Sequence, residues 1–586
     1  MPVACPAPAT RFLDVQQAPH RLRPTMRTDP AVPGGVERPL SILVAPLQDI
    51  AREAVLLLPL FLGLLIGLSH PVQNLNEGLY ARIPEEMLAS GNWVIPTLNG
   101  VPYLEKPPLM YWLTATVYTV FGVHEWTARV APVLGIALGV AAIWRFARSV
   151  FAWDTALYAA WIYVTMPLAI VLGRTLLFDS LFTGLVAWSL VLLHEHWRSP
   201  QPDRRLHWSY AFLALAVLTK GLAALVICAG VAAAYAWSSG RQAAGRRLRE
   251  LFEPSAVAVF FVIAVPWHIA AALQEPGFAW FYFVNEHVYR LLGTRLPHDY
   301  HTGPWWYHLP RVALYAFPWT ALALMPSRHE PQERARTRDA RRFLWLWFLV
   351  PLAVFSLAGE KGEYYMMIGM PALALLLAQR AANLGCLALT IVPLGWLGLL
   401  LWGRLLAHDI APYRLPELET PILFGASVMI TLSIAAFVQG LHRAGIVAAG
   451  VAGFAAMALF SGFIAANESL KSARTIAAEI ARHPKAAVYL YQDYENLSAL
   501  PFYLHANVGV VDSHSSDLWY GIALHPDDER FPDVETFAAL AARDDVWLVV
   551  DEKRMPMFKQ GPLAPLFATI LRSGSQVLLR SAPGTD

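Results

Sequence analysis

Long apolar segments recur from residue 54 to residue 466, and short polar or charged segments separate them. Each apolar segment is close to the roughly 20 residues that a helix needs to cross the hydrocarbon core of a bilayer. The pattern predicts about thirteen transmembrane helices, at residues 54–69, 127–146, 155–172, 177–194, 207–220, 221–238, 255–273, 309–326, 342–358, 364–379, 385–405, 419–440 and 445–466. We therefore expect a polytopic α-helical membrane domain over residues 51–466.

The pattern changes after residue 466. Short β-rich runs lie at 488–491, 508–511, 546–550 and 576–579. Helical patterns lie between them, at about 494–504, 535–543 and 563–572. Strands that alternate with helices favour a small open α/β domain, which we place at residues 467–586. No glycine-rich phosphate loop follows a strand, so we expect no nucleotide cofactor.

Composition supports the membrane setting. Hydrophobic residues make up 56% of the chain and charged residues 15%, against roughly 25% charged in an average soluble protein. Residues 1–50 are rich in proline, alanine and arginine without periodicity. This predicts either a disordered cytoplasmic extension or a sequence read from an upstream start codon, and not a cleaved signal peptide. Cys5, Cys228 and Cys386 lack the spacing of a metal site or a disulfide framework. The net charge of +2 gives no sign of a nucleic-acid partner.

Arginine clusters gather on one side of the predicted helices. They lie at residues 21–52, 145–148, 198–205, 241–249 and 328–342, and at Arg380 and Arg443. The positive-inside rule assigns this side to the cytoplasm. The N terminus is then cytoplasmic, and the C-terminal domain faces outward together with loops 70–126, 173–176, 274–308 and 359–363.

The first outward loop is unusually rich in charged and aromatic residues. It contains Asn76-Glu77-Gly78-Leu79-Tyr80 and Glu105-Lys106-Pro107-Pro108. Residues 78–90 and 107–121 read as two helices that lie along the membrane interface. Their charges either reach to the aqueous surface as ordinary interfacial residues or form part of an active site.

Other candidates stand where predicted helices meet the outer surface. Asp179 begins an apolar segment, where an acidic side chain is costly and either caps the helix or serves function. Lys220 lies between two apolar segments and either binds a phosphate or reaches to the surface. Arg290 has the planar fork of donors that suits phosphate. Lys361 and Tyr364 follow in a later outward loop.

Together these residues suit a substrate that has a sugar, a phosphate and a long lipid tail. An outward site has no access to cytoplasmic nucleotide sugars, so the activated donor is expected to be carried by a lipid. His287 and Glu105 are candidate ligands of a divalent metal ion, although their spacing alone does not define such a site.

The motifs resemble those of the aminoarabinose transferase group, which stands with the protein O-mannosyltransferases among the GT-C membrane glycosyltransferases. The matching residues are Asn76-Glu77-Gly78-Leu79-Tyr80, Glu105-Lys106-Pro107-Pro108, Asp179, Leu218-Thr219-Lys220-Gly221, Glu286-His287-x-x-Arg290, His301-x-x-Pro304-x-Trp306-Tyr307 and Lys361-x-x-Tyr364. Members of the group move 4-amino-4-deoxy-L-arabinose from undecaprenyl phosphate onto lipid A. The resemblance covers residues 70–375 in motifs.

The resemblance implies a set of roles. The donor and its phosphate would be bound by Tyr80, Glu105, Lys106, Lys220, Arg290, Lys361 and Tyr364. Glu77, Asp179 and Asn76 would be the catalytic set, and Glu105 and His287 would be the metal ligands. Asn76 departs from the aspartate usual in the family, and an amide cannot act as a base. Glu77 or Asp179 would then deprotonate a hydroxyl acceptor, whereas an anionic phosphate acceptor needs no base.

We expect an inverting glycosyltransferase of the bacterial inner membrane. It would be a monomer, use a polyprenyl-phosphate sugar, and act on lipid A or another envelope acceptor at the periplasmic face. Two alternatives remain open at this point. One is a transporter or flippase of lipid-linked sugars, and the other is a GT-C polymerase or ligase of surface polysaccharide.

Overall fold

The computed structural model describes residues 57–199, 203–298, 302–326, 335–409, 419–483 and 486–581. The predicted extension at residues 1–50, with Cys5, and His301 of the predicted site lie outside the described residues.

Helices dominate the described chain up to Ala466. After a helical stretch at residues 57–64, the bundle consists of α5 (Val130–Val150), α6 (Trp153–Thr165), α7 (Pro167–Leu172), α8 (Asp179–His196), α9 (Arg205–Lys220), α10 (Ala223–Trp237), α12 (Pro254–Gln274), α14 (His308–Tyr315), α15 (Ala335–Leu357), α16 (Met370–Ala382), α18 (Ile391–Asp409), α19 (Glu419–Val438) and α20 (His442–Ala466). Each of the predicted apolar segments therefore contains helix. Among the described residues, six helices are long and apolar enough to cross a membrane.

Two of the predicted helices are broken at a proline. The segment 155–172 divides into α6 and α7 at Met166, directly before Pro167. The segment 309–326 divides into α14 and a 3₁₀ helix (Trp319–Leu324) that follows Pro318. Proline lacks the amide hydrogen that a continuous helix needs at these positions.

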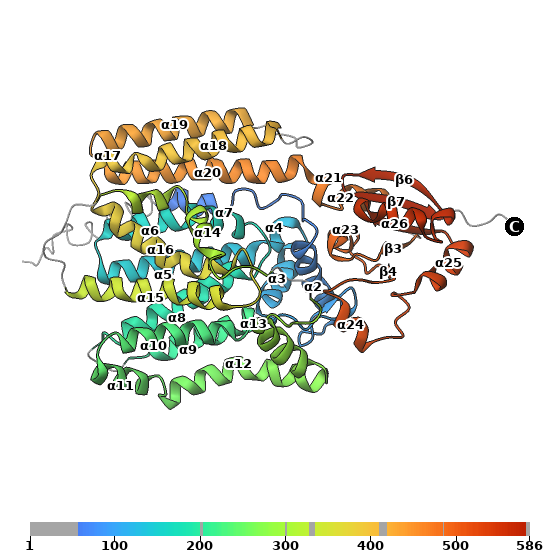
Figure 1. The fold of residues 1–586 in the computed structure, drawn as a ribbon, viewed down its shortest axis with the longest axis horizontal. Coiled ribbons are helices and arrows are strands. Elements are labelled where there is room, and N and C mark those ends of the chain that lie inside the picture. Colours follow the sequence, from blue (N-terminus) through green and yellow to red (C-terminus); the bar gives the residue numbers. More distant parts are fainter. Residues whose placement is uncertain are drawn as a thin grey trace, which may run out of the picture. The chain divides into compact units, whose positions relative to one another are not determined.

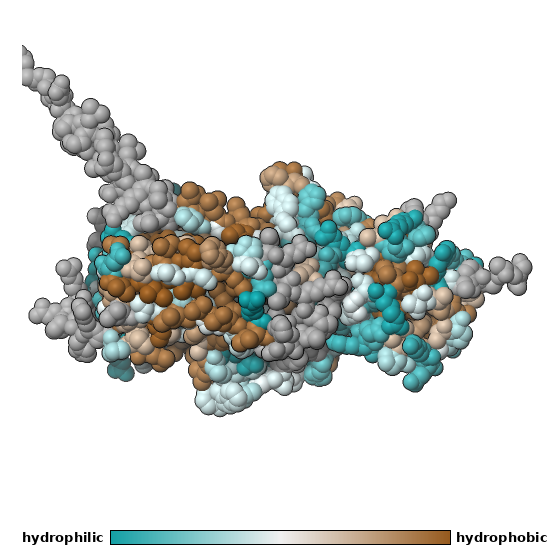
Figure 2. Space-filling model, turned by 90° about the horizontal axis from the view of Figure 1, so that it is seen from above, coloured by the Kyte–Doolittle hydropathy of each residue, from teal (hydrophilic) through white to brown (hydrophobic). Residues whose placement is uncertain are grey.

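Helix α8 packs between α5 and α9 (Figure 1). Gly135 of α5 and Gly184 of α8 allow the close approach, because a Cβ at Gly135 would lie 2.2 Å from the Leu181 amide nitrogen. Small residues at such contacts are typical of helices that pack inside a membrane. The contact fixes Asp179, which begins α8. Apolar residues cover most of the visible face of the helical part, as Figure 2 shows.

Short elements connect the helices outside the bundle. They are α2 (Asn76–Ser90), β1 (Thr97–Leu98), β2 (Val101–Pro102), α3 (Leu109–Phe121), α4 (Glu125–Ala128), α11 (Arg241–Glu250), the π-helix η1 (Trp280–Tyr289), α13 (Arg290–Leu292), the 3₁₀ helix η3 (Tyr365–Gly369) and α17 (Cys386–Leu389). Helices α2 and α3 are the two helices expected in the first outward loop.

Two buried arginines anchor the end of the first helical stretch. Arg174 donates to the carbonyl oxygens of Gly63 and Ile66 at 2.7 and 3.0 Å. Arg129 donates to the carbonyls of Leu68 and His70 at 2.8 and 2.6 Å. The last carbonyls of a helix have no partner within the helix. Arg174 satisfies the one at Gly63, and both guanidinium groups hold the segment that follows, across more than fifty residues of sequence.

The C-terminal part contains a five-stranded sheet. Its strands are β3 (Ala487–Tyr491), β4 (Gly509–Val511), β5 (Val546–Asp551), β6 (Phe567–Ser573) and β7 (Gln576–Ser581), in the order β4-β3-β5-β7-β6. β3 pairs in parallel with β4 and β5, whereas β7 is antiparallel to β5 and β6. The helices here are α21 (Glu468–Lys471), α22 (Arg474–Ile480), α23 (Ala499–Leu504), α24 (Trp519–Leu524), α25 (Val534–Arg543) and α26 (Met555–Gln560).

One prediction in this part is wrong. The segment 563–572 was expected to be helical, but residues 567–573 form strand β6. Gly574, at φ 58°, lies in the turn that leads directly into β7. The hairpin with β7 supplies hydrogen-bond partners that local sequence pattern does not reveal.

The sheet part is joined to the first outward loop by polar contacts. Asn99, fully buried, donates to the Val508 carbonyl at 2.8 Å and accepts from the Val508 amide at 2.9 Å. Arg82 donates to the Asn507 side chain at 3.0 Å, and Arg530 donates to the Asn99 carbonyl at 2.7 Å. These contacts hold the sheet part against the loop that carries Glu105 and Lys106.

Candidate active site

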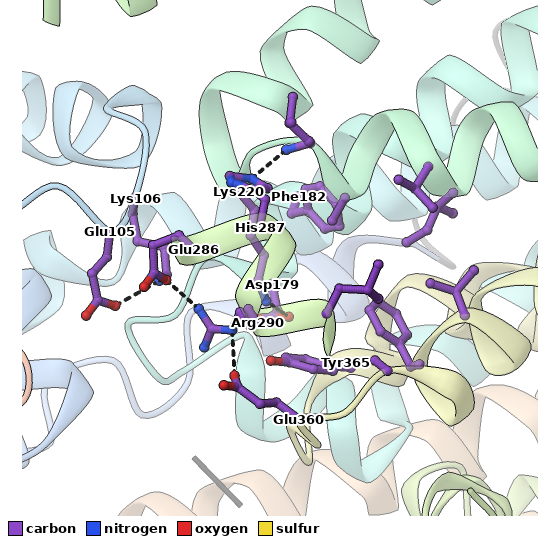
Figure 3. A pocket seen from close by; sticks show the side chains of 18 of the residues that line it. Glu105, Lys106, Asp179, Phe182, Lys220, Glu286, His287, Arg290, Glu360 and Tyr365 are labelled. Atoms are coloured by element: carbon purple, nitrogen blue, oxygen red, sulfur yellow. Dashed lines mark hydrogen bonds and ion pairs between the residues drawn. The ribbon is translucent and has the colours of Figure 1, made fainter. Parts of the chain in front are cut away.

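A cavity of about 480 Å³ lies where α2, α8, α9, α10, α13 and the end of α15 meet. Its polar lining comes from Asn76, Tyr80, Glu105, Lys106, Asp179, Lys220, Glu286, His287, Arg290, Glu360, Tyr364 and Tyr365. The side chains converge from segments far apart in sequence, as Figure 3 shows. Most of the candidate residues from the sequence therefore line one cavity.

The other side of the cavity is apolar. Val226 of α10 and Leu291 and Leu292 of α13 belong to the lining. Their side chains are 54%, 55% and 66% exposed, so this side opens at the surface of the helices. Exposed aliphatic side chains are normal where a helix faces lipid, so the opening suits a hydrocarbon chain that enters from the bilayer.

A chain of ion pairs crosses the polar side. Arg295, fully buried, pairs with Glu105 at 2.6 Å and also with Glu286. Glu286 accepts from Nη1 of Arg290 at 2.8 Å, and Nε of Arg290 lies 3.1 Å from Glu360. Each buried charge is thus paired with an opposite one, as buried ionised groups require.

Lys106 stands beside this chain. Its ammonium lies 3.2 Å from Oε2 of Glu105 and 3.9 Å from Oε2 of Glu286. Burial favours the neutral form of Glu105, but the attraction of Arg295, Lys106 and Arg290 is larger and lowers the pKa of Glu105 to about 2. Glu105 is therefore ionised at neutral pH and cannot act there as a general acid.

A second ion pair closes the cavity on the α8 side. Nζ of Lys220, the last residue of α9, lies 2.5 Å from Oδ1 of Asp179. The same ammonium lies 4.9 Å from the ring centroid of Tyr364 and 5.3 Å from that of Tyr365. Carboxylate and aromatic faces together stabilise this half-buried cation.

Glu77 is placed differently from its neighbour Asn76. It is not among the described residues that line the cavity, and its carboxylate accepts from Arg129 at 2.8 and 3.0 Å, from the Leu176 amide and from the Gln73 amide. Burial raises the pKa of Glu77, but the adjacent Arg129 guanidinium outweighs burial and lowers it. A carboxylate with four donors is a structural anchor, so the structure does not support Glu77 as a base.

Lys361 is also not among the described residues that line the cavity. Its ammonium donates to the carbonyls of Phe355, Ser356 and Ala358 at 3.1, 2.7 and 2.6 Å, at the end of α15. These are carbonyls that the helix itself leaves without partners. The structure therefore gives Lys361 a helix-capping position and does not support it as a phosphate ligand.

The residues expected to bind a metal ion, Glu105 and His287, have other partners in this structure. Nδ1 of His287 donates to the Tyr282 carbonyl at 2.6 Å, and its Nε2 accepts from the Leu222 amide at 3.0 Å. Burial, with the positive charges of Lys106 and others, lowers the pKa of His287 to about 4. Both ring nitrogens are thus engaged within the protein. Across the described ranges, no group of three or more His, Cys, Asp or Glu could hold a metal ion.

Sequence reasoning assigned no role to three charged residues of this site. Glu286 was recognised only as part of a motif, and Arg295 and Glu360 were not singled out. Arg295 follows a glycine and a threonine in an irregular segment, where no periodicity marks it as buried. Only the packed structure brings it between two carboxylates.

Fold and cavity together define a class: a helical membrane protein of the GT-C fold, with a charged cavity that opens between its helices. Residues 105–270 match the sequence model of the family described as dolichyl-phosphate-mannose-protein mannosyltransferase.

Two sequence relatives have names more specific than that of the family model. The chain is 34% identical, over 342 residues, to undecaprenyl phosphate-alpha-4-amino-4-deoxy-L-arabinose arabinosyl transferase 2 of Pseudomonas fluorescens, an alignment that covers 56% of this chain and 60% of the relative. It is 31% identical to the corresponding transferase of Erwinia tasmaniensis, over 53% of this chain and 55% of that protein. The chain thus matches less than two thirds of the length of these relatives.

A solved structure shares the fold over nearly the whole chain. ArnT from Cupriavidus metallidurans, solved bound to undecaprenyl phosphate, superposes with a TM-score of 0.76 at 24% identity, over 92% of this chain and 99% of that one. The resemblance expected from the motifs is confirmed by the family model, the sequence relatives and the fold.

Proposed function

We propose that the protein is a glycosyltransferase that moves a sugar from a polyprenyl-phosphate donor to lipid A or another envelope acceptor. One observation carries the proposal: the cavity joins the cations Lys106, Lys220 and Arg290 to an apolar side, formed by Val226 and Leu291, that opens at the helix surface. A ligand that satisfies both sides has a phosphate and a long hydrocarbon chain. The relatives' names specify such a donor, undecaprenyl phosphate-aminoarabinose.

The reaction is a displacement at the anomeric carbon of the sugar. An acceptor oxygen forms a bond to that carbon as the bond to the phosphate oxygen breaks, which inverts the centre and releases polyprenyl phosphate. Negative charge grows on the departing phosphate. Lys106 and Arg290 stand where they would stabilise it, and groups that stabilise charge as it develops lower the barrier.

Deprotonation of the acceptor depends on its chemistry. Asn76 lines the cavity but cannot take a proton, and Glu77 is held by Arg129. Asp179 is the remaining catalytic candidate, paired with Lys220. A phosphate acceptor on lipid A is already anionic and requires no base, so this set of residues favours an anionic acceptor over a neutral hydroxyl.

The topology is part of the proposal. We infer about thirteen spans for residues 51–466 by the length criterion, with the cavity and the α/β domain of residues 467–586 on the periplasmic side of a bacterial inner membrane. The alternation of arginine clusters supports this orientation. We also propose that the protein acts as a monomer.

The test uses purified protein in lipid, a panel of radiolabelled polyprenyl-phosphate sugars and a membrane extract as acceptor. Glu105→Ala and Asp179→Ala serve as controls. Transfer that both substitutions abolish supports the proposal, and the mass of the product identifies the acceptor. Movement of lipid-linked sugar across proteoliposomes without bond formation would instead favour a transporter.

A further inference from the structure

Glu360 pairs with Arg290 in the lining of the cavity. Its carboxylate lines the cavity, is 6% exposed, and lies 3.1 Å from Nε of Arg290 (Figure 3). A phosphate in the cavity would need the same guanidinium, because the planar fork of an arginine binds carboxylate and phosphate oxygens in the same way.

The backbone fixes Glu360 in this position from both sides. The Gly359 amide donates to the Leu291 carbonyl at 3.0 Å, and Glu360 forms an isolated antiparallel bridge with Thr302. On the other side Lys361 caps α15. The Gly293 and Gly359 backbones approach so closely that a Cβ on Gly359 would lie 2.7 Å from the Gly293 Cα. Glu360 is thus presented to Arg290 by contacts that do not involve its carboxylate.

Orientation of Arg290 does not require Glu360. Glu286, which is 4% exposed, already accepts from Nη1 of Arg290 at 2.8 Å and is itself held by Arg295. Glu286 therefore sets the position of the guanidinium. Glu360 adds a second carboxylate to a cation that Glu286 already neutralises.

The charge of the cavity also indicates that Glu360 and a phosphate compete for Arg290. Among the described residues, the lining contains four carboxylates and three cations, namely Glu105, Asp179, Glu286, Glu360, Lys106, Lys220 and Arg290. Arg295 behind the lining brings the balance to zero. A phosphate that enters with all four carboxylates in place would leave the site with excess negative charge, and unpaired buried charge is costly.

We propose that Glu360 is a competing anion that sets the affinity of the site for phosphate. Resting on the proposed function, this means that the donor phosphate displaces the Glu360 carboxylate from Arg290. When polyprenyl phosphate is the product, the return of Glu360 to Arg290 promotes its release. Glu360 thus lowers the affinity of the site for phosphate.

The test measures the dissociation constant of undecaprenyl phosphate for protein in nanodiscs. Glu360→Gln keeps the size of the side chain and removes its charge, so it is expected to bind the phosphate about tenfold more tightly than the wild type, the order of effect of one close charge pair. Glu363→Gln, an exposed carboxylate three residues further on, is the matched control and should bind like the wild type. Undecaprenol, which lacks the phosphate, should bind the wild type and Glu360→Gln equally.

Unchanged or weaker phosphate binding by Glu360→Gln would overturn the proposal and make Glu360 a positioning residue for Arg290. If the wild type itself binds no undecaprenyl phosphate, the proposed function fails and the inference fails with it. Glu360→Asp is a second variant, in which the charge is one methylene further from Arg290. Its affinity for undecaprenyl phosphate is expected to lie between those of the wild type and Glu360→Gln. Thermal unfolding of each variant reports whether it is folded.

Discussion

Asp179 and Lys220 form an ion pair of 2.5 Å at the points where α8 begins and α9 ends. Asp154 and Arg443 form a pair of the same length elsewhere in the molecule. The two pairs differ in burial, because the side chains are 7% and 17% exposed in the first and 37% and 40% exposed in the second. Distance alone therefore says little about what each pair contributes.

Asp179→Asn is expected to lower the free energy of unfolding by about 3 kcal/mol, because it removes a buried carboxylate and leaves the half-buried ammonium of Lys220 without its counter-charge. Asp154→Asn is the matched control, and an exposed pair of this kind contributes about 1 kcal/mol or less. Thermal unfolding in detergent compares the two variants. Equal losses would contradict the assignment of Asp179 to a buried charge network.

Substitutions of Lys106 and Lys361 are expected to affect different properties. The first should weaken ligand binding, and the second should lower stability. Lys106→Met should weaken binding of undecaprenyl phosphate at least about tenfold, since an interaction with a charged group of roughly 1.5–3 kcal/mol is lost. Lys361→Met should leave binding within about twofold and instead lower the unfolding temperature, because the carbonyls of Phe355 and Ser356 in α15, and that of Ala358 just after it, lose their donor. Titration of both variants in nanodiscs, beside unfolding curves, checks the contrast.

Arg295→Met is expected to weaken the pH dependence of stability. In the wild type the pKa of Glu105 is about 2, below its ordinary 4.5, so the stability that the ionised carboxylate contributes is present above pH 4.5 and is lost as pH falls towards 2. Without Arg295 the pKa of Glu105 should rise towards 4.5, so the ionised carboxylate should contribute less stability above pH 4.5 and less should be lost as pH falls towards 2.

Unfolding temperatures between pH 2 and pH 8 measure this effect. Arg580→Met is the control, because Arg580 forms a pair of the same 2.6 Å length with Asp545 on an exposed surface. If the pH profile of Arg295→Met follows that of the wild type, Arg295 does not lower the pKa of Glu105.

Removal of metal ions is expected to leave activity unchanged. Both nitrogens of His287 are engaged by backbone groups, and Glu105 is paired with Arg295 and Lys106. Transfer rates before and after treatment with a chelator test this expectation, with metal content measured by mass spectrometry. Activity lost on chelation and restored by one divalent ion would show that the site rearranges to bind a metal.

Asn76→Asp is expected to raise the KM for the donor severalfold, because it adds a negative charge to a cavity that already contains four carboxylates. Asn76→Ala should lower kcat by less than about tenfold, since an amide contributes no proton transfer and general-base catalysis is typically worth 10²–10⁴. Steady-state kinetics with varied donor distinguishes the two effects. A large fall in kcat for Asn76→Ala would give the amide a direct role in the reaction.

The sequence motifs predicted which loops meet at the cavity, but not which side chains face it. Asn76 and Glu77 are adjacent, yet successive residues of a helix point about 100° apart, so Asn76 reaches the cavity and Glu77 reaches Arg129. Glu360 and Lys361 show the same division in a loop. A motif gives the position of the backbone, whereas the direction of each side chain depends on packing.

The lengths of the apolar segments predict where the helices lie. They do not predict where a helix is interrupted, and the sequence pattern does not predict strand β6. Pro167 and Pro318 break two segments that hydropathy alone makes continuous. Strand β6 cannot be recognised from its sequence, because its seven residues of mixed polarity fit the repeat of a helix as well as that of a strand. Its pairing with β7 makes it a strand. Arg295 could not be foreseen, since its partners Glu105 and Glu286 come from separate loops.

The contacts of Arg174 also have a consequence for biosynthesis. The carbonyls of Gly63 and Ile66 receive their donors from a residue that the ribosome adds more than a hundred positions later. The first helix therefore cannot reach its final arrangement when it enters the membrane, and it must wait until α7 has been made. We expect a nascent chain that ends before residue 174 to retain a first helix open to solvent at its outer end, where accessibility labelling can detect it.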